Sequence, residues 1–440
     1  MSTRLIGKIF AIGMMTVVIL IALFSVNSVI SSRQEYRNEA AKSIAESYAG
    51  AQTLLGPVLV RPYTQTVDVV EMDSKGVKKT VPRTSEANAV IFPQEFTMTG
   101  VMVPSERRHG LYKVPVYEMQ GHLTGVMEVQ DQKLEGKIVY GEPYLALSVS
   151  DVRGIVGTPK MTVNGFPVQM IQGGSAVAAL NADLKVPLRV TPGGLQGPLR
   201  YELNLVLGGT ERLAVAPVGD SNHIEVKSTW SSPLFAGRFL PRTREVGSGG
   251  FTAAWDISSL ASQTQTQMTE TGKGLDVMDV TLTTVVDPYK LSDRAVKYGV
   301  LFVLLNFGGF FVFEMMKQLP IHPLQYLLVG FGLTIFFLLL ISLSEHMAFW
   351  GAYFVASAAD IGLLTFYLTY VLRSLARGLG FGAMLTVLYA SVYGLLISED
   401  NALVFGSLML FVILAGVMVV TRKVDWYRSG VEVSRAEGGV

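Results

Sequence analysis

The stretch ISLSEHMAFWGAYFVASAAD (residues 341–360) decides the class of fold, because it joins the end of one apolar segment to the first half of another. Glu345, His346 and Asp360 interrupt its apolar character. An Asp at the centre of a membrane helix costs about 2.5–3.5 kcal/mol, and each Leu, Ile, Phe or Val returns about 0.3–0.6 kcal/mol. The second segment can therefore insert into a membrane, provided that Asp360 faces protein or water rather than lipid.

Six segments of the chain are apolar and long enough to cross a hydrocarbon core, which takes about 20 residues. They cover residues 9–30, 298–316, 324–343, 347–371, 379–397 and 402–421. The first segment is longer than the apolar part of a secretory signal, which has about 7–15 residues. This length favours a retained anchor over the alternative, a signal cleaved near Ser28.

Lys and Arg residues in the short connections predict the orientation, because they concentrate on the cytoplasmic side. They occur after the second segment, after the fourth and at the start of the tail: Lys317, Arg373, Arg377, Arg422, Lys423 and Arg428. The connections at 344–346 and 398–401 contain none. Both termini are therefore predicted to be cytoplasmic and residues 31–297 to be extracytoplasmic.

Composition limits the chemistry that is available. Residues 31–297 hold 27 Lys and Arg and 27 Asp and Glu, so their charges cancel and no basic surface for nucleic acid is expected. The chain has no cysteine, which excludes disulfides and thiol chemistry. Its five histidines lack the spacing of a short metal motif, so neither a metal nor a cofactor is predicted.

The extracytoplasmic block begins with a helical pattern and continues with alternation of period two. Ala40, Ile44 and Tyr48 recur at helical spacing, and many later segments, such as YLALSVS (144–150), alternate between turn residues. The Gly-rich runs 173–176 and 247–250 are predicted as turns, and residues 191–198 and 262–274 as loops.

The predicted fold class is a membrane α-helical bundle combined with an all-β domain, the latter an antiparallel sandwich or two packed sheets. Its parts are an N-terminal anchor (1–30), a stalk helix (31–55), a large antiparallel β domain (56–296), a five-helix transmembrane bundle (297–421) and a tail (422–440).

Polar residues around Asp360 form a stripe if the helix continues without a break. At 100° per residue, one face of that helix carries His346, Tyr353, Ser357, Asp360 and Tyr367. His346 would lie about 21 Å along the axis from Asp360, which rules out a direct dyad. The stripe is interpreted as contacts between helices, with a proton or ion path and a lipid or substrate groove as alternatives.

Neighbouring segments offer faces that could match this stripe. Gly378 and Gly382 form a GxxxG pattern that allows close helix approach, and the same segment carries Thr386, Tyr389 and Tyr393. Burial of Asp360 against Thr386 or Asn306 without a cavity would argue against transport. Glu314 and Lys317 have the spacing of an i,i+3 pair at the inner surface.

Two further groups of charged residues invite a functional interpretation. Glu345 and His346 lie at the outer interface, where an anchor or a contact to the β domain is favoured over a catalytic acid and base. Arg107, Arg108 and His109 could hold an anionic lipid or glycan group, although a solvated loop is the simpler interpretation.

Several motifs resemble the CreD family of inner-membrane cell envelope integrity proteins. They are DPYKLSDRAVKYGVLFVLLNFGGFFVFE (287–314), IHPLQYLLVGFGL (321–333), LLLISLSEH (338–346), GPVLVRPY (56–63), GFTAAW (250–255) and TRKVDWY (421–427). The matching positions include His322, Pro323, Gln325 and Tyr326. The resemblance implies a multi-pass protein of the bacterial inner membrane with a periplasmic β domain and a role in envelope integrity and stress tolerance. It implies no catalytic residue. Arg61 differs from the family, which more often has an apolar residue there.

The favoured function is therefore a non-enzymatic envelope protein that acts through its β domain. Its expected partners are membrane lipid and, in addition, envelope proteins or cell-wall components; the sequence does not identify whether a small molecule binds. A transporter or lipid-handling protein that uses the polar stripe is the alternative. A membrane hydrolase that uses Glu345 and His346 is the third hypothesis.

Overall fold

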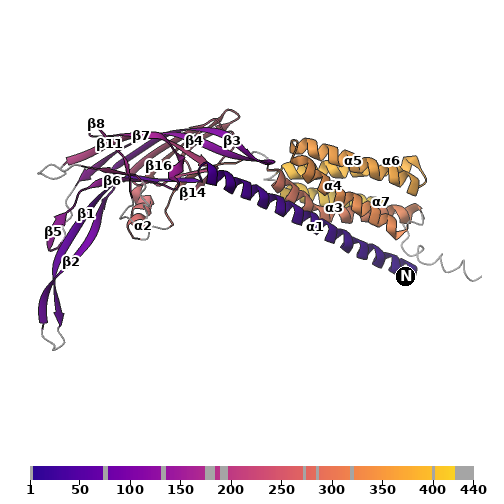
Figure 1. Ribbon diagram of the computed structural model, residues 1–440. Helices are drawn as coiled ribbons and strands as arrows, with labels where there is room; N and C mark the ends of the chain where they lie inside the picture. Colours follow the sequence, from indigo (N-terminus) through magenta and orange to yellow (C-terminus); the bar gives the residue numbers. More distant parts are fainter. Residues whose placement is uncertain are drawn as a thin grey trace, which may run out of the picture. The chain divides into compact units, whose positions relative to one another are not determined.

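The computed structural model describes residues 3–72, 78–129, 135–173, 184–188, 197–270, 274–283, 287–317, 322–398 and 402–421 (Figure 1). These residues form two compact units. One unit joins Met1–Tyr36 to Val286–Val440 and is helical, and the other, Arg37–Val285, is mostly β-sheet. An N-terminal apolar helix, a large and mainly antiparallel β domain and a C-terminal helical bundle confirm the predicted fold class.

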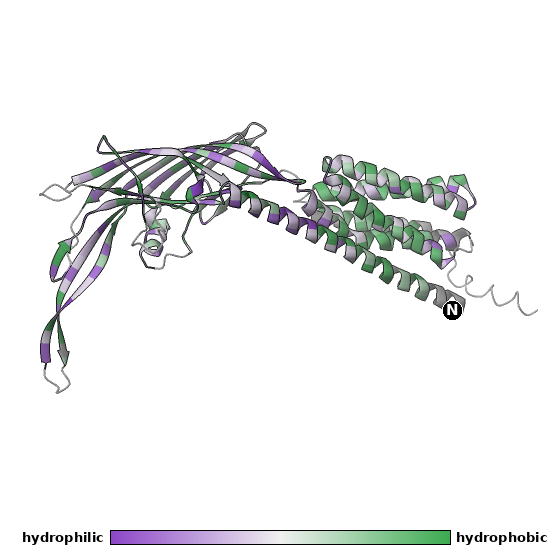
Figure 2. Ribbon diagram, viewed as in Figure 1, coloured by the Kyte–Doolittle hydropathy of each residue, from purple (hydrophilic) through white to green (hydrophobic). Residues whose placement is uncertain are grey.

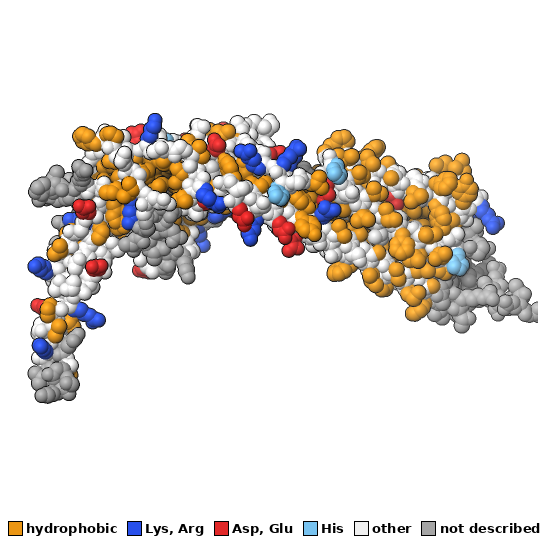
Figure 3. All heavy atoms as spheres, viewed as in Figure 1, with side chains coloured by type: hydrophobic (Ala, Val, Ile, Leu, Met, Phe, Trp, Pro, Cys, Tyr) orange, Lys and Arg blue, Asp and Glu red, His pale blue; other side chains and the backbone are white. Residues whose placement is uncertain are grey.

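The long helices correspond to the predicted membrane segments. Their bounds are α1 (Thr3–Ser47), α3 (Pro288–Lys317), α4 (Pro323–Ser344), α5 (Phe349–Val371), α6 (Leu375–Ile397) and α7 (Ala402–Thr421). Among the described residues, α1, α4, α5 and α6 meet the length and hydropathy needed for a membrane span, and α7 contains a shorter apolar stretch. Figure 2 colours most residues of these helices as hydrophobic, and Figure 3 shows apolar side chains over the surface of the helical unit, as expected where lipid is the solvent.

Helix α1 is a single helix that supplies residues to both units. It continues past residue 30 without a break and ends at Ser47, so that the helical part of the predicted stalk stops before residue 55. Strand β1 already begins at Gln52. The predicted tail, 422–440, lies outside the described residues.

Seventeen strands in the described residues build two sheets. The first sheet has the order β14-β17-β12-β1-β6-β10-β9, with β2 and β5 also pairing with β1; the second has the order β15-β16-β13-β3-β4-β11-β7-β8. Only the β1–β12 and β13–β3 pairs are parallel among these. The bounds are β1 (Gln52–Met72), β2 (Lys78–Ile91), β3 (Glu95–His109), β4 (Tyr112–Val129), β5 (Lys137–Tyr140), β6 (Tyr144–Val149), β7 (Ile155–Val163), β8 (Phe166–Val168), β9 (Ile171–Gln172), β10 (Leu184–Pro187), β11 (Gly197–Thr210), β12 (Arg212–Val215), β13 (Ser221–Ser228), β14 (Pro233–Gly237), β15 (Thr243–Gly247), β16 (Gly250–Ser258) and β17 (Met278–Leu282).

The core lies between the two sheets, because alternate side chains of each strand point inward. In β3, for example, every second residue from Phe96 to Met102 is buried, while Thr97, Thr99 and Val101 between them are at least partly exposed. The buried side chains of β3 share one apolar cluster with residues of the other sheet, such as Leu59 and Leu147. This alternation is the pattern that predicted the strands.

The motif GPVLVRPY lies within β1 at a shift of register. Gly56 has a φ of +93°, which favours glycine, and a Cβ there would lie 2.7 Å from the Ala146 carbonyl oxygen. The register between β1 and β6 shifts between Leu55 and Val58. Arg61, in the same strand, stacks over the Tyr140 ring at 3.6 Å.

The predicted loop at 262–274 is wrong in its central part, where the chain forms the helix α2 (Thr264–Glu270). Met268 is fully buried in the core cluster and anchors this otherwise polar helix. Ser262 accepts a hydrogen bond from the Thr264 N–H at the start of the helix. Residues 248–249 form the turn between β15 and β16, as predicted, whereas residues 174–176 and 191–196 lie outside the described part of the chain.

Candidate functional site

Asp360 is buried inside the helical bundle and is bonded to a tyrosine. It lies on α5 with 5% of its surface exposed. The hydroxyl of Tyr389 on α6 donates a hydrogen bond to its Oδ2 at 2.6 Å. Tyr353, two turns earlier on α5, donates to the backbone carbonyl of Tyr389 at 2.8 Å. We call this arrangement of Asp360, Tyr389 and Tyr353 the membrane pin, because its two hydrogen bonds join α5 to α6.

Aromatic rings and a glycine close the surroundings of the membrane pin. The Phe302 and Phe336 rings each lie 4.6 Å from the Tyr389 ring in edge-to-face geometry. On α4, a Cβ at Gly332 would lie 3.1 Å from Asp360 Oδ1, so that the backbone of α4 approaches the carboxyl closely. Asp360 therefore faces protein, which is what its cost in lipid requires.

Thr386 and Asn306, the two residues considered as neighbours of Asp360, form hydrogen bonds within their own helices. Thr386 donates to the Gly382 carbonyl of its own helix, and the Asn306 side-chain amide donates to the Phe302 carbonyl. Neither of these hydrogen bonds goes to Asp360. Tyr389, one of the polar residues noted on the same segment as Thr386, takes this position.

The predicted polar stripe is shorter than expected. Tyr353 and Ser357 are buried with Asp360 on α5, and Tyr367 is half-buried on the same helix. His346 is not part of the stripe, because α5 begins only at Phe349 and His346 lies exposed in the turn before it. The angle calculated for His346 assumed a helix that does not extend that far.

The GxxxG pattern on α6 packs against threonines of α5. A Cβ at Gly382 would overlap Thr365 Oγ1, and one at Gly378 would overlap Thr369. Small residues thus bring these two helices close enough for Tyr389 to reach Asp360.

Glu345 lies at the C-terminus of α4, where three helices of the same unit meet. Its side chain is 7% exposed, and Arg33 Nε on α1 lies 3.6 Å from its Oε1. The Tyr289 hydroxyl on α3 donates to the same oxygen at 3.3 Å. Glu345 therefore contacts α1 and α3, whereas its sequence neighbour His346 is exposed. This geometry suits a group that positions helices better than it suits a catalytic acid.

The four family-motif positions begin α4. His322 Nδ1 accepts a hydrogen bond from the Leu324 N–H, and Gln325 Oε1 accepts one from the His322 N–H. Pro323 occupies the first helical position, so these residues form a capping box.

Tyr326 and Glu314 join α4 to α3 near the same end. The Tyr326 hydroxyl donates to Glu314 Oε2 at 2.7 Å, and both residues are buried. The pairing of Glu314 with Lys317 stays a prediction, because the Lys317 side chain lies outside what the structure describes.

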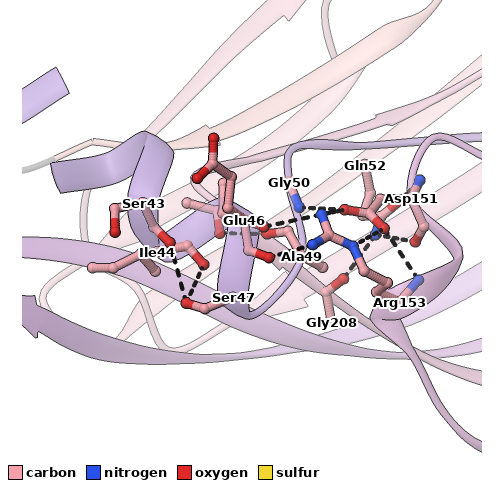
Figure 4. Close-up of polar contacts among 12 residues, drawn as sticks. Ser43, Ile44, Glu46, Ser47, Ala49, Gly50, Gln52, Asp151, Arg153 and Gly208 are labelled. Carbon is pink, nitrogen blue, oxygen red and sulfur yellow. Dashed lines mark hydrogen bonds and ion pairs between the residues drawn. The ribbon is translucent and has the colours of Figure 1, made fainter. Parts of the chain in front are cut away.

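A second polar cluster lies in the β unit, where α1 ends (Figure 4). Arg153 donates to the carbonyl oxygens of Ala45 and Glu46 in the last turn of α1. Its guanidinium also forms a two-pronged ion pair with Asp151, with an Nη2–Oδ2 distance of 2.6 Å and an Nε–Oδ1 distance of 2.9 Å. The last carbonyl oxygens of a helix accept no hydrogen bond from its own backbone N–H groups, so Arg153 supplies the missing donors at the end of α1.

The residues that follow α1 are bound from the same side. Asp151 Oδ2 accepts a hydrogen bond from the Gly50 N–H at 3.0 Å, and Thr210 donates to the Ala49 carbonyl at 2.6 Å. The Gln52 side-chain amide donates to the carbonyl oxygens of Asp151 and Gly208. We call Arg153, Asp151, Gln52 and Thr210 the stalk clamp.

Arg153 also sets the electrostatics of the stalk clamp. Hydrogen bonding from its side chain, helped by the Gly50 and Arg153 N–H groups and opposed by partial burial, lowers the pKa of Asp151 to about 2. Asp151 is therefore ionised across the physiological range. Sequence reasoning missed this cluster, because Arg153 is separated from Glu46 by 107 positions.

Among the described residues, no group of three or more His, Cys, Asp or Glu side chains is placed to hold a metal ion.

Comparison with known proteins identifies the relatives of this chain. The family model described as inner membrane protein CreD matches residues 4–427. The inner membrane protein CreD of Escherichia coli (strain K12) is 34% identical over 433 residues, which cover 97% of this chain and 95% of that protein. The chain belongs to the CreD family. As a member of the CreD family with several apolar helices, it is a multi-pass inner-membrane protein.

Solved structures add no argument to this assignment. An M1 zinc metallopeptidase from Deinococcus radiodurans matches 43% of this chain and 42% of its own, with 13% identity and a TM-score of 0.22. A putative nutrient binding protein from Legionella pneumophila subsp. pneumophila str. Philadelphia 1 matches 48% of this chain and 82% of its own, with 8% identity and a TM-score of 0.24. Both TM-scores are too low to support a shared fold or function.

Proposed function

We propose that this CreD-family protein supports envelope integrity and stress tolerance without catalysis, through contacts that its β domain makes in the periplasm. The distribution of Lys and Arg supports cytoplasmic termini and a periplasmic location for residues 31–297. The partners proposed for this function are membrane lipid and either envelope proteins or cell-wall components.

The stalk clamp is the observation that carries this proposal. A flexible linker is sufficient to tether a β domain that only needs to stay near the membrane. Here Arg153 binds the last turn of α1, while Thr210 and Asp151 bind the residues after it. Such a clamp makes the end of the anchor helix continuous with the sandwich, so that the domain presents a fixed surface to its partners.

Transport or lipid handling is the second candidate, and the membrane pin is the observation that favours it. Asp360 is a carboxyl buried in the bundle, and buried carboxyls in membrane helices often mark a proton or ion path. Its bonding to Tyr389 and the close approach of Gly332 suit a role in joining helices equally well, which makes transport the weaker proposal.

Complementation of an envelope-stress phenotype in a deletion strain tests the leading proposal. A flexible Gly-Ser insertion directly after Ser47, combined with Arg153→Ala, uncouples α1 from the stalk clamp, whereas the same insertion between Ser248 and Gly249 only extends an exposed hairpin turn. We expect the first insertion to abolish tolerance and the second to preserve it, at equal membrane abundance by blotting. Full tolerance with the first insertion would contradict the proposal.

Three point variants separate the two candidate functions in the same assay. Under the leading proposal, Asp360→Asn, Glu345→Gln and His346→Ala retain tolerance when they are present at normal abundance. A normally abundant but inactive Asp360→Asn variant would favour transport or lipid handling instead.

A further inference from the structure

The outer face of the second sheet, opposite the core, carries a long hollow. Its residues come from two neighbouring rows that cross β13, β3, β4, β11 and β7 in register. The first row is Lys227, Val101, Gln120, Val206 and Val156. The second row is Glu225, Thr99, His122, Asn204 and Lys160. Together they line a hollow of about 550 Å³, which we call the trough.

The trough is long and narrow. Its five strands are separated by four spacings of about 4.8 Å, or about 19 Å in all, whereas the two rows lie about 7 Å apart. Towards β15 and β16 it continues into a second hollow of about 580 Å³, because Val101 and Lys227 line both. This shape fits one extended polymer chain that crosses the strands.

An irregularity of the sheet forms the β7 side of the trough. The register of β11 with β7 shifts between Asn204 and Val206, which pair with Lys160 and Val156. Gly157, in the bulge between these two pairs, has a φ of +70°. Because a bulge bends its strand, the backbone itself shapes the trough at this side.

The two rows differ in chemistry, so the trough has an apolar side and a hydrogen-bonding side. Val101, Val206 and Val156 supply aliphatic surface in the first row. In the second row, His122 Nδ1 donates to Asn204 Oδ1 at 2.9 Å. This bond leaves the Asn204 amide N–H groups as donors and Nε2 of the neutral His122 ring as an acceptor. A donor beside an acceptor matches a hydroxyl group, which accepts and donates at once.

Further polar groups of the trough are available to a ligand. The side chains of Thr99 and Gln120 form no hydrogen bond with any residue that the structure describes, and each can both donate and accept. Sugar rings combine apolar C–H faces with hydroxyl groups at their edges. A row of valines beside a row of amide, hydroxyl and imidazole groups is complementary to a chain of such rings.

The charges of the trough argue against a polyanionic ligand. Lys227 Nζ pairs with Glu225 Oε1 at 2.7 Å, whereas Lys160 forms no ion pair with a described residue. The more basic run from Arg107 to His109 does not line the trough. It belongs to β3, which pairs with β4 as far as Tyr112, and this corrects its interpretation as a solvated loop. The trough therefore favours a neutral or weakly anionic chain over a phosphate-rich one.

We propose that the trough binds a polysaccharide strand of the cell wall, which lies across the strands of the sheet. Its C–H faces pack on the valines of the first row, and its hydroxyl groups bond to Gln120 and to the second row. An extended peptide fits less well, because Gln120 and Lys227 interrupt the apolar row that would receive its side chains. The inference rests on the proposed function, since it names the partner of the β domain.

The two polymers of the cell wall provide the test, with the full-length protein in detergent. Amidase treatment of purified sacculi separates glycan strands of N-acetylglucosamine and N-acetylmuramic acid from their peptides, and each fraction is titrated by microscale thermophoresis. The variant is Gln120→Ala with Asn204→Ala, which removes an amide from each row. The matched control is Gln172→Ala with Asn88→Ala, which removes the same groups from β9 and β2 of the other sheet.

We expect the glycan fraction to bind the natural protein and the control equally, and the double variant about tenfold more weakly, because two hydrogen bonds are lost. Val101→Asp, at a position that is 49% exposed, is a second variant and should also weaken binding, because it places a charge in the apolar row.

Three results would overturn the proposal: no binding of glycan by the natural protein, equal affinity in the natural protein and both trough variants, or tighter binding of the peptide fraction. Binding is measured separately from stress tolerance. A failure here would leave the proposed function in place with a different partner, whereas failure of the complementation test would not alter the binding result.

Discussion

The membrane pin and the stalk clamp both use a carboxyl to join a helix to its neighbour, but they choose different partners. Asp360 receives one hydrogen bond from the neutral Tyr389 inside the bundle. Asp151 forms an ion pair with Arg153 and also binds the backbone of Gly50 at the surface of the β unit. The carboxyl is the same group in both places, so the surrounding medium accounts for the difference.

Contact with water allows Asp151 to have a charged partner, whereas the interior of the bundle disfavours a charged partner for Asp360. The Arg153 side chain is 53% exposed, so its charge stays hydrated while it binds Asp151 and the carbonyls of α1. A guanidinium beside Asp360 would have to be removed from water altogether, at a cost that an ion pair often fails to recover. The membrane pin therefore relies on one neutral donor and close packing, whereas the stalk clamp relies on several bonds to backbone.

Among these variants, Gly154→Ala should destabilise the protein most, because the added methyl group displaces Gln52 of the stalk clamp. A Cβ at Gly154 would overlap the Gly208 carbonyl and the Gln52 amide. We expect a loss of about 2–3 kcal/mol in the free energy of unfolding of the β unit, from overpacking and a lost hydrogen bond. Chemical denaturation of the full-length protein in detergent, followed by the fluorescence of Trp230 and Trp255, measures it. The control is Gly249→Ala, which meets open space and should change stability by less than about 0.5 kcal/mol.

Tyr389→Phe should have a smaller effect, because it removes a single hydrogen bond from the membrane pin. Bonds of this kind in membranes contribute about 0.6 kcal/mol on average and up to about 1.7 kcal/mol, and we expect about 1 kcal/mol here. Unfolding of the purified protein by SDS measures the loss. Tyr367→Phe, on the half-buried face of α5, should be close to neutral, and an equal loss in both variants would contradict the account of the pin.

Acid should weaken the stalk clamp within a defined range of pH. The folded pKa of Asp151 is about 2 and its ordinary value is 3.8, so the unfolded chain binds the proton more readily. The stabilisation is fully present above about pH 4 and disappears as the pH falls through 2. The difference in melting temperature between the natural protein and Asp151→Asn should therefore shrink from pH 5 to pH 2. A difference that stays constant over this range would show that the charge of Asp151 does not stabilise the clamp.

Lys297→Ala should have the smallest effect, because it breaks an exposed pair. Lys297 Nζ lies 2.6 Å from Asp293 Oδ2 within α3, and the lysine side chain is 69% exposed. Surface pairs at this spacing contribute about 0.3–0.5 kcal/mol, and salt screens them. SDS unfolding at low and high salt should show a small loss only at low salt; a loss equal to that of Tyr389→Phe would place the pair among the structural contacts.

The periodicity of the sequence predicted the helices and strands well, but it did not predict which side chains form contacts between them. Apolar length predicted the long helices, and alternation predicted strands such as β6, which lies within the segment YLALSVS. The rotation of one helix against another follows from packing on both, so the GxxxG pattern could indicate a close contact without showing that Tyr389, and not Thr386, reaches Asp360. His346 was placed on the stripe because nothing local indicated that α5 begins at Phe349.

Contacts between distant positions could not be predicted from the sequence either, because they also depend on how the elements pack. Arg153 and the end of α1 come together only because the strands around Asp151 fold against β1. The short spacing of Asp151 and Arg153, with a glycine next to them, is a local signal for a capped turn but does not identify its partner. The sequence of α2 is mostly polar, so it did not indicate that Met268 is buried in the core.

The central claim is that the end of α1 and the β-sandwich move as one body, and a distance distribution tests it most directly. Glu39→Cys on α1 and Lys160→Cys on β7 are both exposed, and the natural chain has no other cysteine. Double electron–electron resonance on the spin-labelled full-length protein in nanodiscs should give one narrow distance, which broadens when Gly-Ser is inserted after Ser47 together with Arg153→Ala. A broad distribution in the protein without the insertion, or one that the insertion leaves unchanged, would contradict the claim.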